Sequence, residues 1–264
     1  MTTTSHPARS GVDPLELDGR ITAMYRDVAN GAGADLHFPT GRALAEALGY
    51  PPELLDRLPS DAVSSFAGVG YHLDLAQLQA GERVLDLGSG SGMDAFAAAL
   101  QVWPAGEVAG VDITREQLAN AERLRSSDQV HFHEARIEQL PFDDASFDAV
   151  ISNGVINLSP DKQRVFAEAA RVLRPGGRLA VADIVTEHQI AERTACQADL
   201  WAACIAGASQ RELYFAELTA GGLDLRAARV NRAYSFTSER AQNTSRKYGA
   251  HSVSLLAVKP EVQR

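Results

Sequence analysis

Short apolar runs alternate with stretches of helical periodicity along the last two thirds of the chain. The apolar runs predict strands over residues 83–87, 107–112, 129–134, 147–152, 177–184, 224–230 and 252–258, with helices between most of them. Regular alternation of this kind predicts an α/β fold with a doubly wound, seven-stranded, mostly parallel sheet. Ligands of such sheets bind at the carboxyl ends of the strands, so Asp86, Asp112 and Asn153, each at a strand's end, are candidate site residues.

Two segments fall outside this alternation. Helical patterns at 15–28, 40–48 and 53–58 predict a helical cap over residues 13–80, after a polar N-terminus (1–12) that we expect to be disordered. A further segment, 186–209, comes between the fifth strand and the next helix, and we expect it to form a lid over the same end of the sheet. We expect the cap and the lid to determine substrate specificity, because the sheet itself is a rigid scaffold.

The most informative stretch of the chain is VLDLGSGSG, residues 84–92. An apolar run ends in Asp86, and Gly88, Gly90 and Gly92 then allow a sharp turn whose backbone lies against a ligand. The residues that follow predict a helix, with free N–H groups that point into the turn. Counted from Gly88 the spacing departs from the dinucleotide fingerprint, but counted from Gly90 it fits the looser form, so the glycines alone leave a nicotinamide cofactor open.

Two acidic residues narrow the choice of ligand. Asp112 follows the second strand, where a carboxylate can accept both hydroxyl groups of a ribose, and this predicts a nucleoside. Asp86 ends the first strand, where its charge would repel a pyrophosphate but attract a cationic sulfonium or ammonium group. The pair therefore favours a positively charged nucleoside over a dinucleotide.

The D-x-G-x-G-x-G turn, Asp112 and the later LRPGG at 173–177 together resemble the class I S-adenosylmethionine-dependent methyltransferases, over about residues 81–184. The resemblance implies a Rossmann-like catalytic domain over residues 81–264, with S-adenosylmethionine as cofactor and in-line transfer of a methyl group to a small-molecule acceptor. It implies that Asp86 faces the cofactor's ammonium group, that Asp112 holds the ribose and that the backbone of Asn153 borders the methionine end. The implied cofactor-binding residues are Asp86, Gly88, Ser89, Gly90, Asp112, Ile113, Gln117, Arg136, Ile137, Glu138 and Asn153.

Three segments narrow the resemblance further. ISNGVINLSPDK (151–162), WAACIAGA (201–208) and HFPTG (37–41) are similar to the arsenite methyltransferase family and its unassigned relatives. In that family three thiolates hold the metalloid: one from the loop before the first strand, one after the Ser-Asn pair and one from the helix after the fifth strand. Here Cys204 matches the third position, Gly154 occupies the second, and the first loop contains no cysteine. We therefore expect a changed substrate pocket, with arsenic(III) methylation as an alternative.

The acceptor side of the site is less sharply defined by the sequence. A general base is needed there if the acceptor carries a proton, and the candidates are His72, Tyr25, Asn157 and Cys204. Each also has a structural interpretation, since His72 could serve a loop, Tyr25 could pack in the cap, and Asn157 could brace the loop after the fourth strand. In the same way, Asn153 could be a turn residue that makes its own local hydrogen bonds.

Composition excludes several classes of partner. The chain has 264 residues and a net charge of −9 without a basic block, which argues against nucleic acid. It has no apolar run near the ~20 residues of a membrane span, and the polar N-terminus lacks a signal peptide's apolar segment, so we expect a cytoplasmic monomer or homodimer. The only cysteines, Cys196 and Cys204, would lie ~12 Å apart on a helix, which predicts neither a disulfide nor a metal site.

Two other classes of function stay open at this point. One is an oxidoreductase that uses a nicotinamide, which the glycine spacing alone does not exclude. The other is a protein that binds S-adenosylmethionine without transferring its methyl group, as a cyclase or a sensor would.

Overall fold

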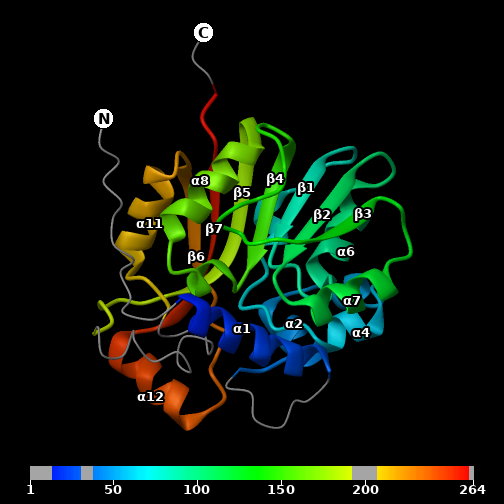
Figure 1. Ribbon diagram of the computed structural model, residues 1–264. Helices are drawn as coiled ribbons and strands as arrows, with labels where there is room; N and C mark the ends of the chain where they lie inside the picture. The colour runs from blue at the N-terminus through cyan, green and yellow to red at the C-terminus, as the bar shows by residue number, and fades with distance from the viewer. Residues whose placement is uncertain (1–13, 31–37, 192–206, 262–264) are drawn as a thin grey trace.

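The computed structural model of the protein describes residues 14–30, 38–191 and 207–261 (Figure 1). These residues form an α/β fold around one seven-stranded sheet in the order β3-β2-β1-β4-β5-β7-β6. The strands are β1 (Arg83–Leu87), β2 (Glu107–Asp112), β3 (Val130–Glu134), β4 (Phe147–Asn153), β5 (Leu173–Val185), β6 (Asp224–Val230) and β7 (His251–Val258). Strands β1 to β5 pair in parallel, whereas β7 is antiparallel to both β5 and β6. The structure confirms the predicted mostly parallel sheet.

The fifth strand begins earlier than predicted, because the LRPGG segment belongs to it instead of forming a separate turn. Leu173 pairs with Phe147, and the register then shifts so that Arg178 pairs with Ala149. Within this bulge, the N–H of Gly176 donates to a backbone carbonyl just after β7, at 2.9 Å. The irregular start of β5 is thus held from both sides, by β4 and by the chain that follows β7.

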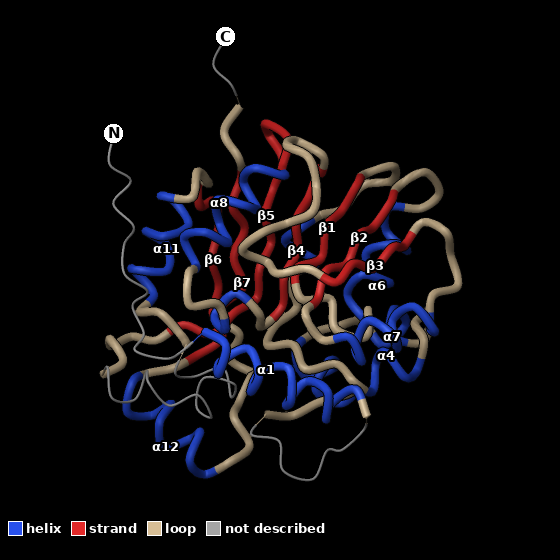
Figure 2. Tube along the Cα trace, viewed as in Figure 1, coloured by secondary structure: helices blue, strands red, loops and turns tan. Residues whose placement is uncertain are grey.

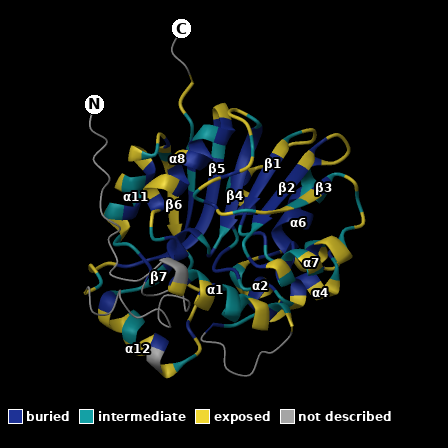
Figure 3. Ribbon diagram, in the orientation of Figure 1, coloured by how far each residue is buried: buried dark blue, intermediate teal, exposed yellow. Residues whose placement is uncertain are grey.

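Alternate side chains of the strands pack on opposite faces of the sheet, as the period-two geometry of a strand requires. On one face, Leu85, Val150 and Leu179 pack against α8 (Lys162–Val172) and α11 (Arg211–Ala220). On the other face, Val84 and Ala149 pack against α6 (Met93–Val102), beside which lies α7 (Arg115–Leu124). Buried strands between helices with exposed outer surfaces are visible in Figure 3, and they show that the sheet is wound on both faces.

The segment before β1 is helical, as the periodicity predicts. It contains α1 (Pro14–Ala29), α2 (Arg42–Leu48), α3 (Pro52–Leu55), α4 (Ser60–Ser64) and α5 (Leu73–Ala76). The third helix ends at Leu55, three residues earlier than predicted, and the one-turn helices α4 and α5 were not predicted. Helices α2 to α5 share one apolar cluster with the sheet. A division into a cap and a catalytic domain stays a prediction.

The carboxyl ends of the parallel strands are covered by α1 and α12 (Glu239–Tyr248), which lie together at one end of the sheet (Figures 1 and 2). Leu17 and Ile21 of α1 join an apolar cluster with Ile184 at the end of β5 and Leu158 in the short helix η1 (Ile156–Leu158). Most of the predicted lid, including Cys196 and Cys204, falls outside the described residues. Its described ends meet, because the N–H of Thr186 donates to the carbonyl of Ser209 at 3.0 Å.

Within the described ranges, no helix combines the length and the apolar character that a bilayer span requires.

Candidate cofactor and substrate site

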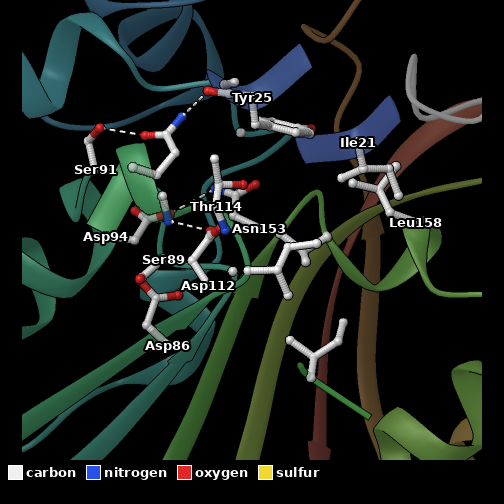
Figure 4. Close-up of a pocket in the computed structure, with 18 of the residues that line it drawn as sticks. Ile21, Tyr25, Asp86, Ser89, Ser91, Asp94, Asp112, Thr114, Asn153 and Leu158 are labelled. Atoms are coloured by element: carbon white, nitrogen blue, oxygen red, sulfur yellow. Dashed lines mark hydrogen bonds between the residues drawn. The ribbon is translucent and has the colours of Figure 1, made fainter. Parts of the chain in front are cut away.

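A cavity of about 1050 Å³, counted with the space at its mouth, lies at the carboxyl ends of β1, β2 and β4, with α1 as one wall (Figure 4). Every residue that the sequence predicted for cofactor binding lines it: Asp86, Gly88, Ser89, Gly90, Asp112, Ile113, Gln117, Arg136, Ile137, Glu138 and Asn153.

Asp86 ends β1 at the floor of the cavity with only 2% of its surface exposed. Its Oδ2 atom has no hydrogen-bond partner among the described residues, and the same holds for the hydroxyl of neighbouring Ser89. Burial raises the pKa of Asp86 well above its usual value, and the negative charges of Asp94 and Asp112 raise it further. A buried carboxylate oxygen without a partner is costly to the folded protein.

Asp112 links the glycine turn to the end of β2. Its Oδ2 accepts from the N–H of Gly90 at 3.0 Å, and its Oδ1 accepts from the N–H of Thr114 at 2.8 Å. Burial raises the pKa of Asp112, while these backbone hydrogen bonds act in the opposite direction. The carboxylate is therefore held in a fixed orientation at the cavity wall, which it lines.

The turn between β1 and α6 depends on glycine for space as well as for backbone conformation. Gly88 has a φ of 71°, in the left-handed region that side chains disfavour. A Cβ atom added at Gly88 would lie 2.3 Å from a methyl group of Val155, which is closer than atoms approach. Because position 88 carries no side chain, the backbone of the turn stays exposed to the cavity there.

Asn153 joins three elements through its side chain. Its Oδ1 accepts from the N–H of Val69 in the loop before β1 at 2.8 Å, and its Nδ2 donates to Asp94 of α6 at 3.0 Å. Tyr50 completes this network, because its hydroxyl donates to Asp94 Oδ1 at 2.5 Å. Burial and the charge of Asp94 raise the pKa of Tyr50 well above its usual value, which keeps the phenol protonated as a donor. The partners of Asn153 are distant in sequence, unlike those of a local turn.

Sequence reasoning missed Asp94, the third carboxylate of the cavity. It lies in the first turn of α6, is 6% exposed and lines the same space as Asp86 and Asp112. An acidic residue in the first turn of the helix after a glycine-rich turn was the available signal, since that position is close to any ligand that the turn holds. Tyr50 gave no such signal, because only the tertiary fold brings it to α6.

The cavity is rich in acidic groups and poor in basic ones. Among the described lining residues, Arg136 is the one basic side chain, whereas five are acidic: Asp18, Asp86, Asp94, Asp112 and Glu138. Arg136 forms ion pairs with Asp18 of α1 and with Glu138, so its charge is already matched. An anionic ligand therefore finds no uncommitted cation in this lining. The remaining walls are largely apolar and include Ile21, Phe66 and Leu158.

The structure separates the four residues predicted for the acceptor side. Tyr25 lines the cavity from α1, stacked against Phe38 with 6.1 Å between ring centroids. His72 and Asn157 are fully buried outside the cavity lining; burial lowers the pKa of His72, and the N–H of Asn157 donates to Asp183 at 2.8 Å. Cys204 lies outside the described residues. A role for His72, Asn157 or Cys204 in catalysis stays a prediction.

The loop before β1 and Gly154, where the resemblance places two of the three thiolates of the arsenite methyltransferase family, lie side by side. A Cβ atom added at Gly154 would contact Val69 at 3.4 Å. Val69 is 1% exposed and belongs to the apolar cluster with Leu17, Ile21 and Leu158. Neither this loop nor position 154 contains a cysteine, so the described part of this chain offers no thiolate there.

Residues 78–243 match the methyltransferase domain family, and the chain belongs to that family. An arsenite methyltransferase of Halobacterium salinarum is 37% identical over 214 residues, which make up 75% of this chain and 54% of the relative. The crystal structure of an arsenic(III) S-adenosylmethionine methyltransferase from Chlamydomonas reinhardtii superposes with a TM-score of 0.61 at 30% identity, covering 85% of this chain and 75% of that one.

The similarity to the arsenite methyltransferases covers only part of their length, and the fold is shared with proteins of other names. The chain spans about half the length of the curated relatives it matches, since the first three are covered over 54%, 47% and 46% of their own sequences. The [4+2]-cyclase SpnF has the same fold, with a TM-score of 0.60 at 20% identity over 94% of this chain and 96% of its own. The fold by itself therefore hosts more than one chemistry.

Proposed function

We propose that this protein transfers a methyl group from S-adenosylmethionine to a small, uncharged or cationic acceptor inside the cavity beside α1. The observation that carries the proposal is the unpartnered, buried Oδ2 of Asp86, next to a glycine turn and to Asp112 in one cavity. A cationic nucleoside supplies what this arrangement lacks, because its ammonium or sulfonium charge compensates the buried carboxylates. A pyrophosphate would instead add negative charge beside Asp86.

The residues of the cavity suit such a cofactor along its whole length. Asp86 would accept from its ammonium group, the backbone of Gly88 and Gly90 would face its amino-acid portion, and Asp112 would accept from its ribose. Ile113 and Ile137 supply apolar surface for its adenine. The cofactor supplies a methyl group already activated by a positive sulfur atom, so the chain has to bind, orient and exclude water more than to activate.

The acceptor is best placed against the apolar walls that Ile21, Phe66 and Leu158 form. The excess of carboxylates and the ion pairs of Arg136 disfavour phosphorylated or carboxylated acceptors, since such groups would be buried without a cation. Tyr25 lines the cavity from α1 and is the candidate general base for an acceptor that must lose a proton.

Methylation of arsenic(III) is the second candidate, because the relatives that match over most of this chain bear that name. Against it stands the absence of cysteine from the loop 65–70 before β1 and from position 154, where the resemblance places thiolates. Cys204, at the third thiolate position of the family, would supply a single sulfur ligand. An arsenic species carried on glutathione is the form that such a site could still accept.

The test is a methyl-transfer assay with the full chain, S-adenosylmethionine and a panel of neutral thiols, cyclic small metabolites and arsenite with glutathione. We expect release of S-adenosylhomocysteine with a non-arsenical acceptor whose mass rises by one methyl group, and we expect Cys204→Ser to keep that activity. Asp112→Ala should abolish the rise in melting temperature that S-adenosylmethionine causes.

Each alternative has its own signature in the same experiment. Stabilisation by NAD but not by S-adenosylmethionine would support an oxidoreductase. Stabilisation by S-adenosylmethionine without a methyl group in any product of the panel would favour a role that binds the cofactor without transfer. Methylated arsenic, lost in Cys204→Ser, would establish the second candidate.

A further inference from the structure

We propose that Gln117 is a positioning residue that couples occupation of the glycine turn to closure of α1 over the cavity. The proposal rests on the proposed function, because it assigns to Gln117 a task beyond contact with the cofactor. The evidence for it is that the buried side-chain amide of Gln117 forms hydrogen bonds to the glycine turn and to α1 at the same time.

Helix α1 forms one wall of the cavity and is packed on the body of the protein along one side. Asp18, Ile21 and Tyr25 face the cavity, while Leu17 and Val28 are buried. Opposite α1 lie the glycine turn and the end of β2 (Figure 4). A molecule between them lies against α1, so the position of this helix affects how fully the ligand is enclosed.

Gln117 comes from α7 and is 2% exposed. Its Oε1 accepts from the hydroxyl of Ser91 in the glycine turn at 2.5 Å, and its Nε2 donates to the carbonyl of Tyr25 in α1 at 2.9 Å. Both bonds appear as dashed lines between Ser91 and Tyr25 in Figure 4. The turn also packs on this amide, since a Cβ atom added at Gly90 would lie 3.7 Å from Oε1.

The chemistry of an amide makes this link directional. When the Ser91 hydroxyl donates to the oxygen, the nitrogen on the other side of the same planar group must point at α1. A ligand that orders residues 88–91 thereby fixes the donor that holds Tyr25, and a closed α1 in turn fixes the hydroxyl beside the ligand. Such coupling is reciprocal and has typical values of about 5–150-fold in affinity.

Asn120, one turn further along α7, provides a matched control. Its Nδ2 donates to the carbonyl of Ala29 at the end of α1 at 2.9 Å, so it also fastens the helix to α7. The other described hydrogen bond of its side chain goes to Arg123 on the surface. Asn120 thus holds α1 as Gln117 does, but without a bond to the glycine turn.

The experiment measures hydrogen–deuterium exchange of residues 14–30 in the full chain, with and without S-adenosylhomocysteine, together with the dissociation constant of that ligand. In the wild-type protein we expect the ligand to slow exchange in α1. In Asn120→Ala we expect faster exchange in the free protein, but the same dissociation constant within about twofold and the same slowing by the ligand.

Two substitutions of Gln117 separate coupling from packing. Gln117→Met keeps the size but removes both hydrogen bonds, and we expect about tenfold weaker binding and no slowing of exchange in α1 by the bound ligand. Gln117→Glu keeps the acceptor for Ser91 but loses the donor to Tyr25, so it should lose the slowing in α1 as well.

The outcomes distinguish this proposal from the proposed function. If S-adenosylhomocysteine binds the wild-type protein and slows exchange in α1 equally in Gln117→Met, the coupling role is overturned and the function stands. If Asn120→Ala lost the ligand-induced slowing of exchange in α1 to the same extent as Gln117→Met, the coupling role would also be overturned. Any hydrogen bond that fastens α1 to α7 would then be enough to produce the effect. If the ligand fails to bind the wild-type protein, both proposals fall.

Discussion

Asp86 is a single residue whose buried charge lowers the stability of the folded protein and lines the cavity. Its carboxyl group is buried beside Asp94 and Asp112, and burial raises its pKa well above the usual value. The charged form is therefore less stable in the folded chain than in the unfolded one. A side chain that opposes folding and lines a cavity is explained by a ligand that needs its charge.

Asp86→Asn is the first prediction. The neutral amide removes the buried charge at nearly constant shape, so the free energy of unfolding should stay the same or rise by about 1 kcal/mol, as measured by urea denaturation at pH 7. The dissociation constant of S-adenosylhomocysteine should rise roughly 30-fold or more, as expected for a buried charge that loses its partner. Because the ionised form binds, affinity in the wild type should also increase as the pH rises through the raised pKa of Asp86.

The fully exposed Asp128 supplies the control, since Asp128→Asn removes the same charge far from the cavity and should change neither quantity. A parallel loss of stability and affinity in Asp86→Asn would instead mean that Asp86 supports the fold and not the ligand.

At the level of elements, the turn between β1 and α6 is held on every side. The N–H groups of Gly88 and Ser89 donate to the carbonyl of Val111 in β2, at 2.8 and 2.9 Å, and Asp112 accepts from Gly90. Val155, from the loop after β4, fills the space beside Gly88. The turn is therefore preorganised by its neighbours, which spares a ligand the entropic cost of ordering it.

Gly88→Ala and Gly81→Ala form a matched pair for the second prediction. Both positions have a positive φ, 71° and 87°, but a Cβ atom at Gly81 would meet no heavy atom within 4 Å. Gly81→Ala should cost about 1–2 kcal/mol of unfolding free energy for its backbone alone and leave affinity for S-adenosylhomocysteine unchanged. Gly88→Ala should cost a further ~1–3 kcal/mol for overpacking and weaken the affinity.

Val155→Ala in the Gly88→Ala background should recover part of both losses, because it removes the methyl groups that the new side chain meets. Calorimetric titration measures the affinity of each variant for S-adenosylhomocysteine, and urea denaturation measures its unfolding free energy. Equal costs at positions 81 and 88 would show that crowding by Val155 plays no part.

At the scale of the whole molecule, Asp183 ties together segments that are far apart in the chain. It is fully buried at the end of β5; its Oδ2 accepts from the N–H of Asn157 in η1 and from the hydroxyl of Tyr214 in α11, both at 2.8 Å. Burial raises the pKa of Asp183 to about 6, although these hydrogen bonds and nearby Lys162 oppose the rise. The loop that borders the cavity is thus anchored to a group that titrates near neutral pH.

The third prediction concerns stability and pH. Between about pH 4 and 6 the folded protein retains a proton on Asp183 that the unfolded chain has released. The contribution of Asp183 is therefore fully present below about pH 4 and is lost as the pH rises through 6, by about 3 kcal/mol. Urea unfolding from pH 4 to 7 should show this fall in the wild type relative to Asp183→Asn, which is less stable at low pH but lacks the slope. Parallel curves for the two proteins would contradict the assignment.

The sequence determined the elements of this protein and the chemistry of its cofactor end. Strands alternate with helices in a pattern that local periodicity reveals, and a strand, a glycine turn and a helix must follow one another wherever such a turn occurs. Asp86 and Gly88 could be placed because they lie at the end of β1, Asp112 because it lies at the end of β2, and the ends of parallel strands meet.

Only the tertiary structure decided which side chains complete the cavity. Tyr50 reaches Asp94, Asn153 holds Val69, and Gln117 joins Ser91 to α1, all across separations of 26 to 92 residues. His72 precedes β1 closely in sequence, yet it is buried outside the cavity. Local pattern reports which face of an element is apolar, but contacts between elements depend on how the whole chain packs, and no short window of sequence contains that information.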